Sequence, residues 1–212
     1  MEHTKKAWLI RPNPHGHYRM PEFKTQNIVA IGWPGIGDIT GISREGLKQT
    51  LAGKPYDLSG LALGNAYATV DILLNQMQKG DLVLVADGAD IYFGEIAGDY
   101  SFECFVDNDS EGYPHQRPVT WLTHLSREDL SKELRSALKV HRTAANLSHH
   151  FDEINALAHG QPYQPAEDAS STVAVSYPLR PDFQIEFKIP SDITRDEAQR
   201  LSSYFASLYF TE

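Results

Sequence analysis

Two tryptophan-ended segments bracket the central part of the chain and restrict the folds open to it. Residues 27–33, Asn-Ile-Val-Ala-Ile-Gly-Trp, come first, and residues 115–121, His-Gln-Arg-Pro-Val-Thr-Trp, come last. Between them a Gly-Asp pair opens the apolar run 82–85, and a Gly-x-Ile strand follows. Short apolar strands separated by turn residues are typical of a small β-barrel rather than a layered enzyme sheet. Trp33 precedes Pro34, which cannot donate a hydrogen bond to a sheet, so we expect Trp33 where a strand leaves the barrel.

The composition is that of an ordinary globular protein, with 41% hydrophobic and 22% charged residues in 212. No window approaches the roughly 18 apolar residues of a membrane span. The first six residues run directly into a predicted strand, which leaves no room for a signal peptide. Cys104 is the only cysteine, which excludes an intrachain disulfide and a cysteine zinc site. We expect a cytoplasmic protein with no membrane contact, no metal site and no cofactor.

Charge is distributed unevenly along the chain. A formal net charge of −9 argues against strong nonspecific binding of nucleic acid, which requires Lys and Arg to displace counterions. Residues 99–111 are acidic. The first segment, residues 5–24, is basic and contains Lys5, Lys6, Arg11, His15, His17, Arg19 and Lys24. We therefore expect a local basic face but no long groove that follows phosphates.

The hydrophobic pattern defines a first domain at residues 1–159. Period-two and continuous apolar runs predict strands at 7–11, 27–33, 82–86, 91–97 and 117–121. Helical periodicity predicts helices at 43–51, at 61–77, after the capping sequence 126–129, and around 147–157. The fold class expected is α+β, a small mixed barrel flanked by helices.

A second, smaller unit follows a linker. Residues 160–171 are rich in Pro, Gln and Ser without apolar periodicity, which is typical of a linker. Beyond it, 183–189 alternates apolar and polar residues as a half-buried strand does, and 172–176 is expected to pair with it as a hairpin. Thr194 opens a capping box and a helix. A unit of about 40 residues is marginal alone, so we expect residues 172–212 to dock on the first domain or on a second chain.

Several residue groups resemble enzyme motifs, but their spacing along the chain differs from what those motifs require. Glycines 32, 35 and 37 lack the dinucleotide-binding spacing and have no phosphate-loop lysine. A restriction-type nuclease site has an Asp and a Glu-x-Lys pair on separate strands of a hairpin. The chain has these residue types at Asp182, Glu186 and Lys188, but all three fall on one predicted strand. His149 and His150 are adjacent, so on a helix their rings point apart. We therefore expect no enzymatic activity.

The order of the motifs resembles a known group of domains. Ile-Arg-Pro at 10–12 is followed by the Gly-Trp strand end, a helix, the Gly-Asp strand, the Gly-x-Ile strand, and then His115, Arg117, Val119 and Trp121 in a His-x-Arg-x-Val-x-Trp pattern. This order is similar to the PUA-like superfamily that contains EVE and YTH domains. It is most like the EVE-like modules of modification-dependent restriction and phage-defence proteins. The resemblance covers roughly residues 7–158 and implies a PUA-like barrel.

Known members of this group bind a modified base in an aromatic pocket. The resemblance implies that Trp33 forms one wall of such a pocket, with Pro34 beside it. Arg11 and Pro12 match the strand whose backbone lines the pocket in YTH-type domains. Asn65 stands on the helix where those domains carry a pocket-facing Asn-Glu pair, although the acidic member is missing here.

The remaining site residues are expected from their positions in the chain. The loop aromatics Tyr100, Phe102 and Phe105 are candidates for the opposing wall, although Phe102 or Phe105 could equally anchor the loop in the core. Arg19, Lys24 and His115 are expected at the rim, in contact with phosphate. We interpret Trp8, Trp121 and Arg117 as mainly structural.

These observations favour noncatalytic recognition of a modified base in DNA or RNA, as a sensor in a prokaryotic defence system. Stacking contributes roughly 1–3 kcal/mol per base, and extracting a base costs a few kcal/mol. Phosphate contacts or avidity must therefore add affinity, through a homodimer formed by residues 172–212 or a separate effector protein. Two alternatives stay open: a module for a free nucleotide or purine-like metabolite, and a structural adaptor without a ligand pocket.

Overall fold

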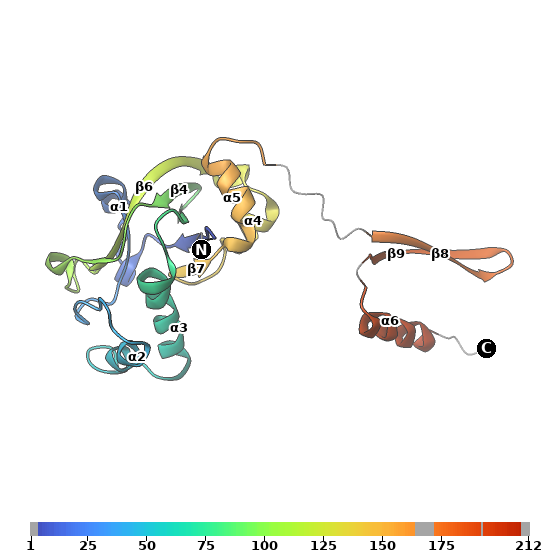
Figure 1. Cartoon of the computed structure of the whole chain (residues 1–212), viewed down its shortest axis with the longest axis horizontal. Coiled ribbons are helices and arrows are strands. Elements are labelled where there is room, and N and C mark those ends of the chain that lie inside the picture. The colour runs from blue at the N-terminus through green and yellow to red at the C-terminus, as the bar shows by residue number, and fades with distance from the viewer. Residues whose placement is uncertain (1–3, 164–171, 192, 209–212) are drawn as a thin grey trace. The chain divides into compact units, whose positions relative to one another are not determined.

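The computed structural model describes residues 4–163, 172–191 and 193–208. The chain divides into two compact units, Met1–Tyr163 and Gln164–Glu212, which are coloured blue to orange and orange to red in Figure 1. No helix within the described ranges is long and apolar enough to cross a bilayer.

A seven-stranded mixed sheet forms the centre of the first unit. Its strands are β1 (Ala7–Ile10), β2 (Ile28–Ile31), β3 (Leu82–Asp87), β4 (Asp90–Ile96), β5 (Ser101–Phe102), β6 (His115–Ser126) and β7 (Ala144–Asn146). The order is β2-β6-β4-β3-β1-β7, with β5 on β6. Only β1 and β3 run parallel among the described pairs. The predicted α+β class with flanking helices is confirmed. The sheet curls into half a barrel and does not close, because its two end strands, β2 and β7, are not paired with each other.

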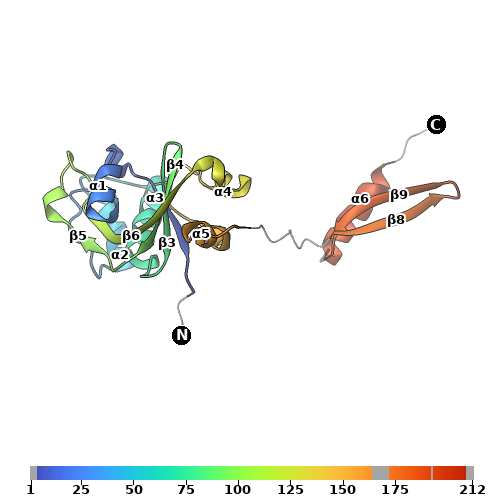
Figure 2. The ribbon, with the colours of Figure 1, turned by 90° about the horizontal axis from the view of Figure 1, so that it is seen from above.

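Helices cover both faces of this sheet. The longer ones are α1 (Met20–Gln26), α2 (Arg44–Ala52), α3 (Gly60–Asp71), α4 (Lys132–Ala137) and α5 (Phe151–Ala158). A π-helical turn, η2 (Ile72–Gln76), continues α3, and short 3-10 turns are η1 (Pro14–Gly16), η3 (Cys104–Val106), η4 (Arg127–Asp129) and η5 (Ser148–His150). Helices α1, α2 and α3 pack on one face, and α4 and α5 pack on the other (Figure 2).

Strand β1 is buried on both faces because it lies between two apolar cores. Trp8 and Ile10 belong to the core under α1–α3, whereas Ala7 and Leu9 belong to the core under α4 and α5. Successive side chains of a strand point to opposite faces, so a strand covered on both sides is apolar throughout. This accounts for the unbroken apolar run from Ala7 to Ile10.

The Gly-Asp pair before β3 has a structural role. Asp81 is fully buried, and its carboxylate accepts hydrogen bonds from the backbone N–H of Lys6 at 2.9 Å, the indole N–H of Trp8 at 2.8 Å and the backbone N–H of Gln78 at 3.0 Å. The carboxylate therefore joins the start of β3 to β1. A buried acceptor with several donors cannot be removed cheaply, because each donor left behind loses its partner.

Several elements differ from the sequence prediction. Helix α1 was not predicted, since it has seven residues and buries only Met20 and Phe23, too few for a periodic signal. Strand β6 extends to Ser126, beyond the predicted 117–121, because its second half pairs with β4. The predicted helix 61–77 is α3 followed by the π-helical turn.

The second unit consists of the hairpin β8 (Thr172–Arg180) and β9 (Phe183–Pro190) and the helix α6 (Arg195–Ser207). The predicted hairpin and capping box are confirmed: β8 pairs antiparallel with β9, and Thr194 and Glu197 exchange side-chain and backbone hydrogen bonds. Every side chain described in this unit is exposed or only partly buried. From the sequence, Tyr209 and Phe210 are also predicted to extend the apolar surface of this unit, but both lie outside the described residues.

Candidate ligand-binding site

Trp33 lies just beyond the end of β2 in an unusual backbone conformation. Its φ of +67° falls in the left-handed region, which bulky residues rarely adopt. The chain comes close to itself here, because a Cβ at Gly32 would lie 2.6 Å from the backbone nitrogen of His15. His15 also has a positive φ, of 49°. Strained backbone of this kind persists where surrounding contacts hold it, often at ligand sites.

His115 provides one of these contacts. Its ring is fully buried, with Nε2 3.4 Å from the carbonyl oxygen of Trp33 and Nδ1 2.8 Å from the hydroxyl of Tyr100. Burial lowers the pKa of His115 to about 4, so the ring is neutral at pH 7. The network assigns the single ring proton to Nε2, which donates to Trp33, while Nδ1 accepts from Tyr100.

Tyr100 completes a chain of hydrogen bonds that ends at Trp33. Its hydroxyl also accepts from the backbone N–H of Ile39, and burial raises its pKa above the ordinary value. Its ring stacks on His115 with 6.0 Å between centroids and an interplanar angle of 21°. Tyr100 therefore supports the backbone of Trp33 through His115.

Two hollows flank the partly buried Trp33. The first, which we call the helix-side hollow, has a volume of about 290 Å³ and is lined by Trp33, Leu58, Ala62, Asn65, Ala66, Thr69, His141, Arg142 and Thr143. The second, the loop-side hollow, has a volume of about 230 Å³ and is lined by Asn13, His15, Gly16, Gly32, Trp33, Tyr56 and Thr143. Both lie slightly below the range of about 300–1,000 Å³ typical of small-molecule sites, which suits a single planar ring rather than a larger ligand.

Tyr56 fixes the chain immediately after Trp33. Its hydroxyl donates to the carbonyl oxygen of the buried Pro34 at 2.8 Å. Burial, with Asp109 and Asp107 nearby, raises the pKa of Tyr56 to about 12, so this donor is retained at neutral pH.

Arg11 positions the loop on the other side of the helix-side hollow. Its guanidinium donates to the carbonyl oxygens of Leu138 and Val140, the latter at 2.9 Å, and its backbone N–H donates to Thr143 at 2.9 Å. This loop carries Lys139, His141 and Arg142, and we call these three residues the basic loop. Arg11 therefore acts behind the wall of the hollow, and Pro12 is buried beside it.

A model of the family described as "Domain of unknown function (DUF8426)" matches residues 9–147. The chain belongs to this family. The matched segment contains Trp33, Asn65, His115 and the basic loop, so both walls of the helix-side hollow fall within DUF8426. No curated protein and no solved structure matches the chain.

Within the DUF8426 segment, the predicted pair Trp33 and Asn65 meets in one hollow. The basic loop was not singled out from the sequence, although the run Lys-Val-His-Arg directly after a predicted helix carries a local signal. Its role becomes visible only when Arg11, over 120 residues earlier in the chain, is seen to hold the carbonyls at the end of α4.

The expected aromatic wall opposite Trp33 is not present in the structure. Pairing of β5 with β6 places Phe102 against His115, with ring centroids 5.8 Å apart, and Tyr100 points toward the same histidine. Phe105 is 86% exposed, so it is neither a wall nor a core anchor. None of these three aromatics lines either hollow.

The expected rim residue Arg19 is occupied by internal contacts. It forms ion pairs with Glu22 at 2.9 Å and Glu111 at 3.3 Å, and it donates to the carbonyl oxygens of Ser110 and Glu111. Its side chain is only 15% exposed. The basic first segment and the acidic loop, predicted separately, therefore neutralise each other at this contact.

The other two expected rim residues also lie elsewhere. Lys24 places its ammonium group 5.1 Å from the ring centre of Tyr92 and lines a separate hollow with Trp121. His115 is inside the core, because both ring nitrogens are engaged with Trp33 and Tyr100. Neither residue can form a rim around Trp33 in this arrangement.

Two residues interpreted as structural have contacts that fit this role. Arg117 is buried and donates to the carbonyl oxygens of Leu73, Leu74 and Gly98, which closes the π-helical turn. The indole of Trp121 donates to the carbonyl oxygen of Phe23 at 3.2 Å.

Within the described ranges, no group of three or more His, Cys, Asp or Glu side chains is placed to hold a metal ion.

Proposed function

We propose that the helix-side hollow binds one modified base of DNA or RNA, without catalysis, and that the first unit is a PUA-like domain of the EVE or YTH type. The observation that carries the proposal is the partly buried Trp33, which lines an open hollow together with Asn65 and with His141 and Arg142 of the basic loop. These residues offer a stacking surface, a hydrogen-bonding amide and a guanidinium group in one place. The order of strands and motifs supports the PUA-like assignment.

The chemistry of the hollow fits a nucleobase. A planar base stacks on an indole with about 1–3 kcal/mol of free energy. The amide of Asn65 has both donor and acceptor groups, which suit the edge of a base. The exposed Asn65 leaves this amide accessible from solvent.

The basic loop supplies the phosphate contact in this proposal. His141 and Arg142 are exposed at the wall of the helix-side hollow. A guanidinium group can donate two parallel hydrogen bonds to a phosphate. Arg142 takes the role that the sequence had suggested for Arg19, because Arg19 is paired with Glu22 and Glu111.

A free nucleotide is the second candidate ligand. The pairing of Arg19 with the acidic loop favours it, because the basic loop alone can neutralise one phosphate but cannot follow a strand. A structural adaptor without a pocket is less well supported, since Trp33 is only partly buried and borders two hollows.

Titration of a panel of ligands tests the proposal. Oligonucleotides that carry single modified bases, their unmodified counterparts and the free nucleosides and nucleotides are compared by fluorescence anisotropy and calorimetry. Saturable binding of one modified oligonucleotide, at least tenfold tighter than its unmodified counterpart, is expected. Tight binding of a free nucleotide with no gain from the polymer would favour the second candidate, and no binding in the panel would contradict both.

A further inference from the structure

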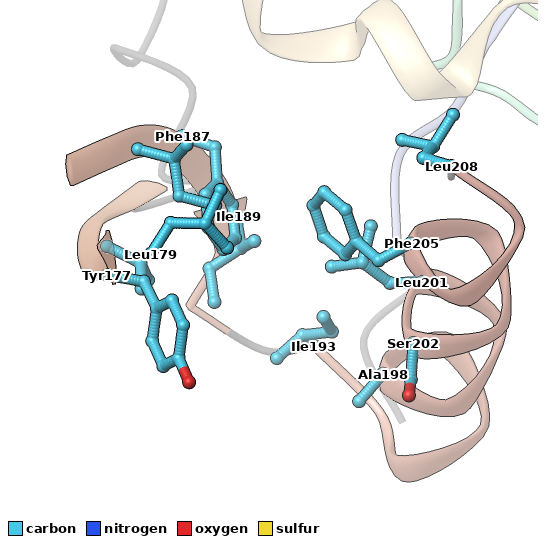
Figure 3. Close-up of a pocket in the computed structure, with 12 residues that line it drawn as sticks. Tyr177, Leu179, Phe187, Ile189, Ile193, Ala198, Leu201, Ser202, Phe205 and Leu208 are labelled. Carbon is cyan, nitrogen blue, oxygen red and sulfur yellow. The ribbon is translucent and has the colours of Figure 1, made fainter. Parts of the chain in front are cut away.

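The second unit has a broad apolar groove between its hairpin and its helix. The groove has a volume of about 800 Å³. Figure 3 shows Leu179, Phe187 and Ile189 of the hairpin on one side and Leu201 and Phe205 of α6 on the other, all directed toward the same open space.

The unit does not close this groove itself. Leu179 is 55% exposed and Leu208 is 51% exposed, although both line the groove. A ring contact between Phe187 and Phe205, with centroids 5.7 Å apart, joins the two sides. A two-stranded hairpin is marginally stable in water, and an apolar surface of this kind usually marks an interface.

The two edges of the hairpin differ in their capacity to accept another strand. Strand β8 contains Pro178, which has no N–H, and its register shifts between Pro178 and Arg180. Strand β9 has no proline from Phe183 to Ile189, and the only pairing described for it is with β8. An unbroken edge strand of this kind is a ready template for a further strand.

The sequence of β9 is complementary to itself when two copies run antiparallel. If a two-fold axis passes beside Phe187, Glu186 of each copy lies opposite Lys188 of the other copy. In the same register Ile185 lies opposite Ile189 on the apolar face. Opposite charges and apolar pairs at directly opposed positions both stabilise an antiparallel ladder, and a two-fold axis applies each pair twice.

We propose that the chain forms a homodimer in which the β9 strands of two copies pair around Phe187. The result is a four-stranded antiparallel sheet in the order β8-β9-β9-β8. Its apolar face is twice as wide as that of one hairpin, and the apolar stripes of two α6 helices cover it. The second copy of the chain therefore continues the apolar face of the hairpin beyond the edge of β9. This inference does not depend on the ligand of the Trp33 site.

Charge exchange on β9 tests the pairing directly. Sedimentation velocity and light scattering over a concentration series compare full-length wild type with Glu186→Lys, Lys188→Glu and the double variant. Each single variant places like charges opposite each other in both pairs, so we expect dimer dissociation constants about tenfold higher. The double variant restores opposite charges, and its constant returns to within about threefold of wild type.

Arg180→Glu is the matched control, because it changes charge by the same amount at the exposed last residue of β8, away from the proposed pairing. It is expected to dimerise like wild type. Far-ultraviolet circular dichroism confirms that each variant keeps its secondary structure. A wild-type chain that stays monomeric at micromolar concentration overturns the proposal and indicates that the groove is covered within the chain or by another protein. If the chain dimerises but the single charge reversals leave the dissociation constant unchanged, the proposed β9 pairing is wrong.

Discussion

The carbonyl oxygen of Trp33 accepts a hydrogen bond from Nε2 of the buried His115, over a distance of 3.4 Å. His115 in turn accepts from Tyr100, so a side chain expected at the rim and one expected in the opposing wall both act beneath Trp33. The two residues hold the left-handed backbone that places the indole between the hollows. The site is therefore organised by a buried polar chain rather than by an aromatic cage.

Acidification should destabilise the first unit through His115. Burial lowers its pKa from 6.5 to about 4, so the unfolded state binds a proton before the folded state does. The stabilisation is complete above pH 6.5 and is lost as pH falls toward 4, at about 1.4 kcal/mol per pH unit. Urea unfolding at several pH values measures this slope.

His115→Gln should make that pH dependence shallower. His149→Gln is the control, because His149 is exposed and should leave the slope unchanged. An equal pH dependence of unfolding in wild type and His115→Gln would show that His115 does not titrate as described.

Tyr100→Phe should destabilise the first unit by about 1–3 kcal/mol, because it leaves buried polar groups of His115 and Ile39 without their partner. Tyr18→Phe makes the same chemical change at a residue that is 52% exposed and donates a hydrogen bond to Asp87. It should therefore have little effect on the free energy of unfolding. Urea unfolding of both variants gives the comparison. Equal free energies of unfolding would argue against the buried chain.

Asp81→Ala should destabilise the first unit by about 3 kcal/mol or more, since three N–H donors lose one buried acceptor. Asp90→Ala, at an exposed position at the start of β4, is the matched control and should change stability little. Thermal unfolding followed by tryptophan fluorescence checks both variants. A melting temperature of Asp81→Ala close to that of the control would contradict the anchoring role of this carboxylate.

If the ligand is a polynucleotide, Arg142→Ala should reduce the salt dependence of binding by about one unit of slope, because one phosphate contact is lost. Arg19→Ala should leave the slope unchanged, since Arg19 is paired with Glu22 and Glu111. Binding constants measured from dilute to physiological salt test both. If Arg19→Ala reduces the salt slope and Arg142→Ala does not, then Arg19 rather than Arg142 contacts the phosphate.

The strands that form the core could be predicted because their signals are local. β1 and β3 are unbroken apolar runs buried on both faces, and the capping box at Thr194 lies next to the helix it starts. α1 could not be predicted, because its seven residues bury only Met20 and Phe23, too few for a periodic signal.

The site was predictable only in part, for a similar reason. The position of Trp33 follows from the chain around it, and Asn65 was inferred from a resemblance. The orientation of Tyr100, the pairing of Arg19 and the placement of the basic loop each depend on a contact with a distant part of the chain. Residue type and spacing carry little information about such contacts.

The most direct test of the account is the affinity of Trp33→Ala for the ligand found in the panel. Loss of indole stacking should weaken binding at least tenfold, an effect within the roughly 1–3 kcal/mol range for one base. The melting temperature should stay within a few degrees of wild type, because Trp33 is only partly buried. Phe105→Ala, which removes an aromatic ring that is 86% exposed and lines neither hollow, should bind like wild type. Wild-type affinity in Trp33→Ala would contradict the proposal that this hollow is the binding site.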